Sequence, residues 1–502
     1  MWSNRRRQVA LAVLGGAVAL FGLACAERVV YRDVRFPTPP AAAANFLGFE
    51  TADNNETVCG NCHVGHQADW ERTAHADAWN SLVASGHSQG FCEGCHTVNF
   101  RGNSVNDSTG GWVSTKDTRY HDVQCESCHG PGLDHVQNPE GAVPLAPIAV
   151  GADLSLGCGE CHNGTHHPFV EEWEQSGHGK LLASPSKRAE CQSCHTAKGA
   201  LDAWGVTANY KEKNTGEGHQ LAIVCAVCHD PHSNEASRRA DEGGTGPTSA
   251  LKTPNSGGQL RYSVDVPNEE QNLCMKCHHK RAQPDIDTTF NSRGPHSPQG
   301  PLVLGENVGF WFSDTPSGDR IYGSHGPGGN PRLCATCHMA RYEITDQATG
   351  AFKLQAAGHR FAATPCVDAE GNPTGATDCA ITAKSFRGCV GSGCHATQDA
   401  ARSAFTVVET RITNLAAELD ALIDQVRATE ISSTDRRWSS AEGAQFNYDL
   451  AVVKKGSKIH NPFMIEALLT ASIREMERTY GLSAQVNVDL RNIIGTSHLK
   501  AP

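Results

Sequence analysis

The chain has 502 residues, of which only 39% are hydrophobic and 6% aromatic. Its 50 glycines and 24 prolines are typical of turns and loops, and the apolar side chains are too few for an ordinary core of this size. The formal net charge of −11 argues against nucleic acid as a partner.

The N-terminus predicts export. Arg5 and Arg6 precede an apolar run over residues 9–24 that is too short and too rich in glycine and alanine for a membrane span. We interpret residues 1–25 as a signal peptide. Two cleavage sites remain open: Ala24-Cys25-Ala26 suits an ordinary signal peptidase, whereas Leu23-Ala24-Cys25 resembles a bacterial lipobox.

Cysteine counting favours the lipoprotein. Of 21 cysteines, 18 fall in the motifs described next, and Cys366 with Cys379 can form a disulfide, which is acceptable outside the cytoplasm. Only Cys25 is left, and a lipid there would hold the chain at a membrane surface without spanning the membrane. Residues 26–55 would then be an extended linker. We expect a periplasmic or outer-membrane-attached lipoprotein that can also face the cell surface.

Eight copies of Cys-x-x-Cys-His follow, and a ninth site has the same ending after a longer spacer. The cysteine pairs are Cys59 and Cys62, Cys92 and Cys95, Cys125 and Cys128, Cys158 and Cys161, Cys191 and Cys194, Cys225 and Cys228, Cys274 and Cys277, Cys334 and Cys337, and Cys389 and Cys394. The histidines that directly follow them are His63, His96, His129, His162, His195, His229, His278, His338 and His395.

This pattern is the attachment signature of haem c, in which two thioethers hold the porphyrin and the histidine binds the iron. Zinc or an iron–sulfur cluster would not require a histidine after every second cysteine. The sequence therefore predicts nine haem c groups. At the ninth site the spacer has four residues, and a chance cysteine pair beside a histidine is the alternative.

The motifs repeat in groups of three. The first six begin 33 or 34 residues apart, and the loops after the first and fourth share Trp-x-x-Ser/Thr-x-His, at residues 70–75 and 173–178. We expect three-haem modules at residues 56–150 and 151–235, and a looser third module with haems seven to nine at residues 236–397.

The second axial position of each iron decides function, because a second histidine closes the iron to substrate. Ten histidines are candidates for the second ligand of nine irons, so at least one is wrong. They are chosen because they occupy equivalent positions in the repeat, follow Gly-Pro or Asp-Pro, lie in the loops of the third module, or sit beside a helix cap. They are His75, His121, His135, His178, His219, His232, His296, His325, His359 and His460. His87 is the reserve, and we expect His66, His166, His167, His279 and His498 to face solvent.

The C-terminal region, residues 398–502, has helical patterns. Phe405, Val408, Ile412, Leu415, Leu419, Leu422 and Val426 follow heptad spacing. A second helix is predicted with Asn461 as its cap, Pro462 at its first position and Gly481 at its end. We expect these helices to pack as a helical hairpin or small bundle, or to form a contact with another subunit.

Residues 123–132 (VQCESCHGPG), the two Trp-x-x-Ser/Thr-x-His segments and residues 225–232 resemble the family of the tetrahaem cytochrome of ammonia oxidisers. Its larger relatives include hydroxylamine oxidoreductase, octahaem tetrathionate reductase and pentahaem nitrite reductase, and residues 458–462 resemble their C-terminal part. The resemblance implies a mainly α fold with extensive loops, organised by haems in alternating parallel and perpendicular pairs with two histidines on most irons. The chain departs from the nitrite reductases because it lacks a Cys-x-x-Cys-Lys motif, and none of its eight tyrosines stands out for a porphyrin crosslink.

We interpret the chain as an electron conduit rather than an enzyme, and assign no catalytic residue. Its expected partners are redox proteins: a quinol oxidase module, a porin–cytochrome complex or an extracellular acceptor. The alternative is a reductase of nitrite, hydroxylamine or tetrathionate, which needs one haem without a second histidine. A homo-oligomer or filament, with an axial histidine from a neighbouring subunit, is a third interpretation.

Overall fold

The computed structural model describes residues 38–483, with gaps at 104, 106–107, 146–156, 204–220, 230, 233–272, 281–283, 291, 307, 317–319, 331–332, 347, 392–393, 431–436 and 455. Of residues 427–430 it describes the backbone alone. The chain divides into two compact units, residues 1–38 and 39–502, and nearly all described residues belong to the second. The predicted signal peptide, Cys25, His219 and His498 lie outside the described residues.

The described part of the N-terminal half consists of short helices joined by loops. They include η2 (Val58–Asn61), α2 (Val64–Trp70), α3 (Ala78–Ala84), α4 (Glu93–His96), α6 (Cys125–His129), α7 (Leu133–Gln137), α8 (Phe169–Gln175), α10 (Ala189–His195), α11 (Ala197–Ala203) and α12 (Cys225–Cys228). Cys-x-x-Cys-His motifs lie on or beside several of these helices, and one helical turn brings both thiols and the histidine to one place. The mainly helical, loop-rich fold is as predicted.

The repeat seen in the sequence is also a repeat of hydrogen bonds. In both copies, the Trp-x-x-Ser/Thr-x-His segment forms two hydrogen bonds with the residue two positions before the third motif of the group. The tryptophan indole donates to the carbonyl of that residue, and the histidine carbonyl accepts from its N–H. The bonds run from Trp70 Nε1 to Val123 O (2.9 Å), Trp173 Nε1 to Ile223 O (2.7 Å), Val123 N to His75 O (3.1 Å) and Ile223 N to His178 O (3.1 Å). Each group of three motifs therefore uses one local design.

The next segment contains α15 (Gln299–Leu304), α16 (Leu333–His338) and a β-hairpin. Strands β1 (Tyr342–Thr345) and β2 (Phe352–Ala356) are antiparallel, with Tyr342 opposite Ala356. A loop follows, in which Cys366 and Cys379 form the predicted disulfide. Helix α17 (Arg387–Gly391) carries the start of the ninth motif.

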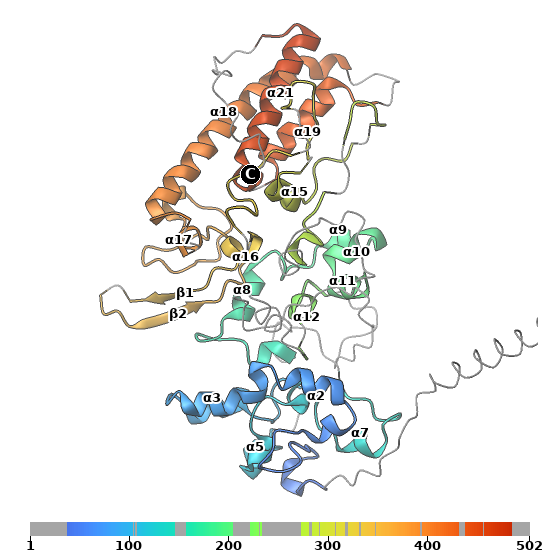
Figure 1. Cartoon of the computed structure of the whole chain (residues 1–502), viewed down its shortest axis with the longest axis vertical. Coiled ribbons are helices and arrows are strands. Elements are labelled where there is room, and N and C mark those ends of the chain that lie inside the picture. Colours follow the sequence, from blue (N-terminus) through green and yellow to red (C-terminus); the bar gives the residue numbers. More distant parts are fainter. Residues whose placement is uncertain are drawn as a thin grey trace, which may run out of the picture. The chain divides into compact units, whose positions relative to one another are not determined.

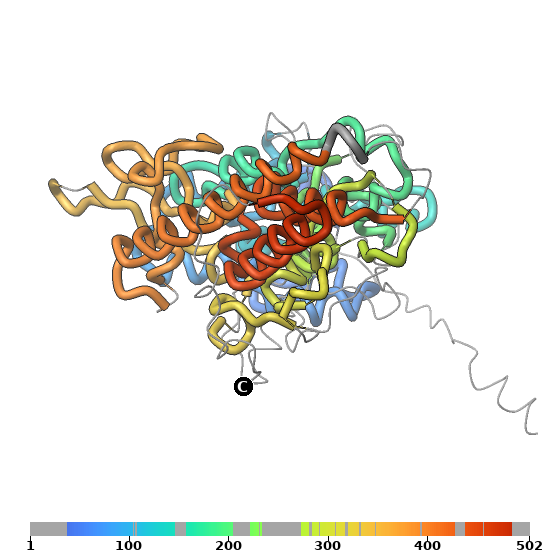
Figure 2. Tube along the Cα trace, turned by 90° about the horizontal axis from the view of Figure 1, so that it is seen from above, coloured from blue at the N-terminus to red at the C-terminus, as the bar shows by residue number. Residues whose placement is uncertain are grey.

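Three helices form the C-terminal bundle. Helices α18 (Gln398–Glu430), α19 (Ser440–Val452) and α21 (Pro462–Tyr480) pack against one another, and both views show them side by side (Figure 1, Figure 2). The predicted heptad seam of α18 faces this core from Ile412 to Val426, where every seam residue is buried. Phe405 and Val408, at the start of the seam, are half-buried. The predicted small bundle is confirmed.

Helix α21 begins and ends as predicted. The Asn461 side chain accepts a hydrogen bond from Met464 N (3.0 Å), Pro462 follows in the first turn, and Gly481 ends the helix in the left-handed conformation. Asn461 Nδ2 also donates to Leu302 O (3.0 Å) and Ile321 O (2.6 Å), which ties α21 to helix α15 and to the loop that follows it. Within the described residues, no helix combines the length and apolar character that crossing a membrane requires.

Candidate haem sites

Seven motif histidines each face a second histidine at one characteristic separation. The ring centres of the pairs are 6.0–6.2 Å apart. The pairs are His63 with His135, His162 with His75, His129 with His232, His278 with His178, His195 with His296, His229 with His359, and His338 with His460. Metal–imidazole bonds of about 2 Å on each side, plus roughly 1 Å from each nitrogen to its ring centre, give about 6 Å. The pairs therefore fit an iron held between two imidazoles.

Several of these rings are oriented by the backbone. Where the Nδ1–H of a histidine donates to a carbonyl, the other nitrogen is left to bind metal. Such bonds run from His96 to Ala78 O (2.9 Å), His135 to Ala142 O (2.9 Å), His325 to Ile459 O (2.7 Å), His338 to Phe361 O (2.7 Å) and His359 to Ala357 O (3.2 Å). The carbonyls thus preset the tautomer that an iron ligand needs.

Burial favours the neutral form of three of the paired imidazoles. It lowers the pKa of His162 to about 3, of His178 to about 4 and of His460 to about 3, and the charges of neighbouring histidines lower them further. Metals bind the neutral imidazole, so these rings need not lose a proton at neutral pH.

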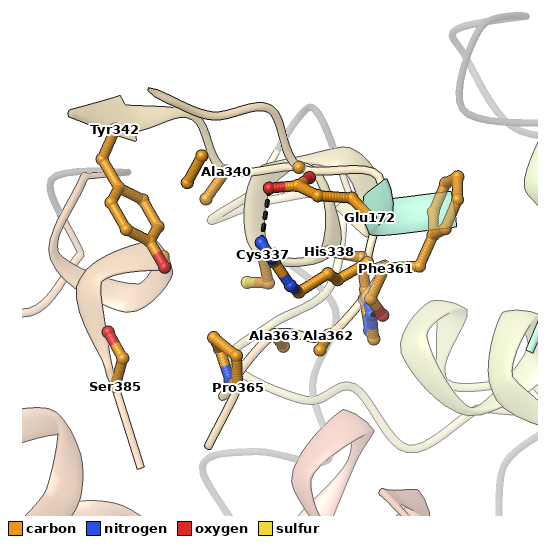
Figure 3. A pocket seen from close by; sticks show the side chains of 14 residues that line it. Glu172, Cys337, His338, Ala340, Tyr342, Phe361, Ala362, Ala363, Pro365 and Ser385 are labelled. Atoms are coloured by element: carbon orange, nitrogen blue, oxygen red, sulfur yellow. Dashed lines mark hydrogen bonds and ion pairs between the residues drawn. The ribbon is translucent and has the colours of Figure 1, made fainter. Parts of the chain in front are cut away.

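A buried acid positions the partner of the sixth motif. Glu172, on α8, accepts hydrogen bonds from Ala357 N (3.0 Å) and His359 N (2.7 Å), and it forms an ion pair with Arg360. Figure 3 shows this pair as a dashed line from the Glu172 carboxylate. The residue therefore ties the second group of motifs to the loop that carries His359.

The cysteine thiols, which stand for the thioether sulfurs of attached haem, contact one another in a regular series. In five pairs, the thiol of one motif is the main cause of a shifted pKa in the thiol of another: Cys59 with Cys125, Cys95 with Cys161, Cys158 with Cys225, Cys194 with Cys277, and Cys274 with Cys334. Three further thiols have a pKa raised by burial and then by a nearby thiol: Cys128 by Cys158, Cys228 by Cys274, and Cys337 by Cys389. The motifs that meet are therefore 1 and 3, 2 and 4, and 3 and 4. The same set recurs three motifs later as 4 and 6, 5 and 7, and 6 and 7, and motifs 7 and 8 and motifs 8 and 9 also meet.

Comparisons with known proteins agree with this chemistry. Residues 58–130 match the family described as cytochrome c554 and c-prime. The C-type polyheme cytochrome OmcC of Geobacter sulfurreducens is 25% identical over 314 residues, which cover 56% of this chain and 36% of OmcC. The multiheme cytochrome MtrA of Shewanella baltica is 27% identical over 165 residues, 28% of this chain and 46% of MtrA. The chain thus spans less than half the length of these relatives.

The chain is a multihaem c-type cytochrome. A crystal structure of the outer cell wall cytochrome OcwA matches its fold with a TM-score of 0.52 at 16% identity, and the match covers 86% of this chain and all of that one. This likeness confirms the predicted fold class. The narrower resemblance to hydroxylamine oxidoreductase and tetrathionate reductase stays a prediction.

Some predicted ligands of the cytochrome are not in such pairs. The ring of His121 packs 5.5 Å from that of Phe49, and His121 Nδ1 lies 2.9 Å from Asp122 Oδ2. His279, expected to face solvent, is buried, and its Nδ1 lies 3.2 Å from Met275 O. That expectation was wrong, because His279 directly follows motif seven and other segments of the same chain bury its side chain. His66, His166 and His167 are exposed, as expected, and so is the reserve, His87.

Two motif histidines of the cytochrome differ from the rest. In the described part of the chain, neither His96 nor His395 has a second imidazole ring in contact. His96 nevertheless has its Nδ1 tied to Ala78 O like the paired rings.

A small pocket lies beside motif eight. Glu172, Cys337, His338, Tyr342, Arg360 and Ser385 are among its lining residues, and the hydroxyl of Tyr342 points toward Ser385 (Figure 3). Burial raises the pKa of Tyr342. With a volume of about 20 Å³, the space suits a single water molecule and not an organic substrate.

Proposed function

We propose that the cytochrome is an exported electron-transfer protein in which nine haems pass electrons between redox partners. The observation that carries this proposal is the set of seven histidine pairs at an iron-bridging separation. An iron with an imidazole on each face is low-spin and has no position for a substrate, so it can only take up and release an electron.

The thiol contacts suggest the order of the haems. Thioethers attach to the porphyrin edge, so sulfurs in contact bring two porphyrin edges together. The series then runs through haems 1, 3, 4, 6, 7, 8 and 9, with haem 2 beside haem 4 and haem 5 beside haem 7. We infer one main line of seven haems with two side branches.

The same contacts refine the third module. Cys274 meets Cys334 as Cys158 meets Cys225, so motif eight takes the place of a third motif. Motif nine then begins the next group, and the third module has no branch haem. In this scheme His325, whose ring is held by Ile459 O, serves the ninth iron at His395.

Partners and location follow from charge and from the N-terminus. The net charge is −11, and haem propionates add to it, so we expect partners with a basic patch. We infer an anchor at Cys25 and a place in the periplasm, at the outer membrane or at the cell surface. OcwA, whose fold is similar, is an outer cell wall cytochrome by its name.

A second candidate function is reduction of nitrite, hydroxylamine or tetrathionate. It is favoured by His96 and His395, because a haem with one histidine ligand has an open position. Such an enzyme also needs proton donors and cations at the open face.

Protein-film voltammetry separates the two functions. For a conduit we expect reversible waves from all the haems and no catalytic current when nitrite, hydroxylamine or tetrathionate is added. A current that grows with one of these substrates would support the reductase and overturn the conduit.

A further inference from the structure

Five of the seven histidine pairs follow a rule that links neighbouring groups of three motifs. The other two differ, because His63 pairs with His135 inside the first group and His338 pairs with His460 in the C-terminal region. The partners of His162 and His278, both in first motifs, come from the loop after the preceding first motif: His75 and His178. The partner of His195, in a second motif, comes from the other direction. It is His296, which follows the first motif of the next group.

The rule also covers the third motifs. His129 and His229 pair with His232 and His359, which follow the third motif of the next group when motif eight is counted as one. Ligands are thus exchanged between neighbouring groups in a fixed pattern.

Applied to the second motif of the first group, the rule points to one segment. By analogy with His195 and His296, the partner of His96 should follow His162. The residues from 157 to 203 are all described, and they contain three histidines besides the motif residues: His166, His167 and His178. His178 already faces His278, which leaves two.

Contacts separate these two residues. The ring of His166 stacks on Phe352 of β2, with centres 5.3 Å apart and planes 2° from parallel. The ring of His167 instead packs 6.3 Å from His162, the motif histidine next to the second haem. The side chains of His167 and His96 are also close enough for their charges to interact.

The setting of motif two agrees. The Cys95 thiol interacts with Cys161, and Gly102 N, shortly after motif two, donates a hydrogen bond to the carboxylate of Glu160 inside motif four. The second haem and motif four are therefore neighbours. His167 is exposed, and its N–H closes a turn on Gly164 O (3.1 Å), where Gly164 has φ +80° and open space around it. The ring of His167 also stacks on Phe169, with centres 6.4 Å apart. Binding to the iron held by His96 would require the exposed side chain to rotate away from this ring.

We propose that His167 is the second axial ligand of the haem attached at Cys92 and Cys95. The inference rests on the proposed two-histidine ligation of the other haems. It makes the haem 2 branch a closed electron carrier, and it removes one of the two candidates for an open site.

The test compares His167→Ala with His166→Ala in the full haem-loaded chain, by low-temperature EPR of the oxidised protein and by mass. With all nine haems attached, His167→Ala should convert about one ninth of the low-spin ferric signal to high-spin, and added imidazole should reverse the change. His166→Ala should match the wild type. His167→Met should stay low-spin but raise one midpoint potential, because a thioether ligand favours ferrous iron.

Two results would overturn the assignment in different ways. A low-spin wild type that stays fully low-spin in His167→Ala removes His167 as the ligand and leaves the conduit intact. A high-spin signal of one haem in the wild type that His167→Ala does not alter removes the ligand and supports the reductase instead. If His167→Ala loses the haem, the shift expected for His167→Met decides alone.

Discussion

The imidazole of His162, in the fourth motif, lies 6.1 Å from that of His75, which belongs to the loop after the first motif. An iron between them would join two groups of motifs that are far apart in the sequence. The other six pairs also join distant segments. By analogy with disulfides, a cross-link that closes a loop of about 100 residues can stabilise a fold by several kcal/mol. The haems would therefore hold the modules together as well as carry electrons.

Replacing His75 with alanine tests this double role. We expect one haem to become high-spin, and the urea midpoint to fall by the equivalent of about 2–4 kcal/mol because a long-range cross-link is lost. EPR and urea denaturation of the same sample measure both effects. His87→Ala, on an exposed segment, is the control, and equal stability of the two variants would contradict the prediction.

Glu172 offers a test of how the sixth haem is positioned. The Glu172→Gln variant leaves Arg360, whose side chain is 12% exposed, without its counter-charge, and weakens the bonds to Ala357 N and His359 N. We expect a loss of about 3 kcal/mol in the free energy of unfolding, and altered EPR g-values for one low-spin haem. Glu190→Gln, in the exposed pair with Arg188, should change neither quantity.

Asn461 joins the C-terminal bundle to the haem region. Asn461→Ala removes the cap of α21 and leaves Leu302 O and Ile321 O without their donor, so we expect a loss of about 3 kcal/mol. Ser439→Ala, which removes only the cap of α19, should cost about 1 kcal/mol. Chemical denaturation measures both, and similar losses would mean that the two carbonyls contribute little.

The C-terminal bundle was predictable because its signals are local: heptad spacing on α18, and Asn461, Pro462 and Gly481 around α21. The attachment motifs were predictable for the same reason. The pairing of the histidines was not, since the ring of His75 faces that of His162, which is 87 residues away, and only the three-dimensional packing brings the two together. His121 shows the limit: its distance from motif three is similar to that of His219 from motif six, yet its ring packs on Phe49. The burial of His279 likewise depends on residues that are far from it in the sequence.

Glu126, inside motif three, should make stability depend on pH. It accepts bonds from Leu47 N, Gly48 N and Gly132 N, and no side chain in the described ranges forms an ion pair with it. Burial raises its pKa from 4.5 to about 7. The folded protein therefore binds a proton that the unfolded chain releases between these values. The contribution of Glu126 to stability is thus greatest below pH 4.5 and is lost as pH rises through about 7.

The Glu126→Gln variant removes this titration. We expect its unfolding free energy, measured from pH 5 to 8, to fall less than that of the wild type, by up to about 3 kcal/mol. Glu190→Gln should follow the wild-type curve. Parallel curves for Glu126→Gln and the wild type would show that the Glu126 carboxyl is already ionised at pH 5.

The ninth attachment site can be counted directly. A double variant, Cys389→Ala with Cys394→Ala, should lower the intact mass by one haem beyond the change in sequence, because both thioethers are lost. The disulfide cysteines, Cys366 and Cys379, provide the control, since their replacement should leave the haem count unchanged. An unaltered haem count in the double variant would limit the cytochrome to eight haems.

The central claim is that the irons are closed by two histidines and that the protein conducts electrons. Low-temperature EPR of the purified, fully oxidised protein tests it most directly, with nitrite, hydroxylamine and cyanide added in turn. We predict low-spin ferric signals only, with no high-spin component that responds to any of the three. A high-spin signal of about one haem that shifts when one of them binds would contradict the account and make the protein a reductase.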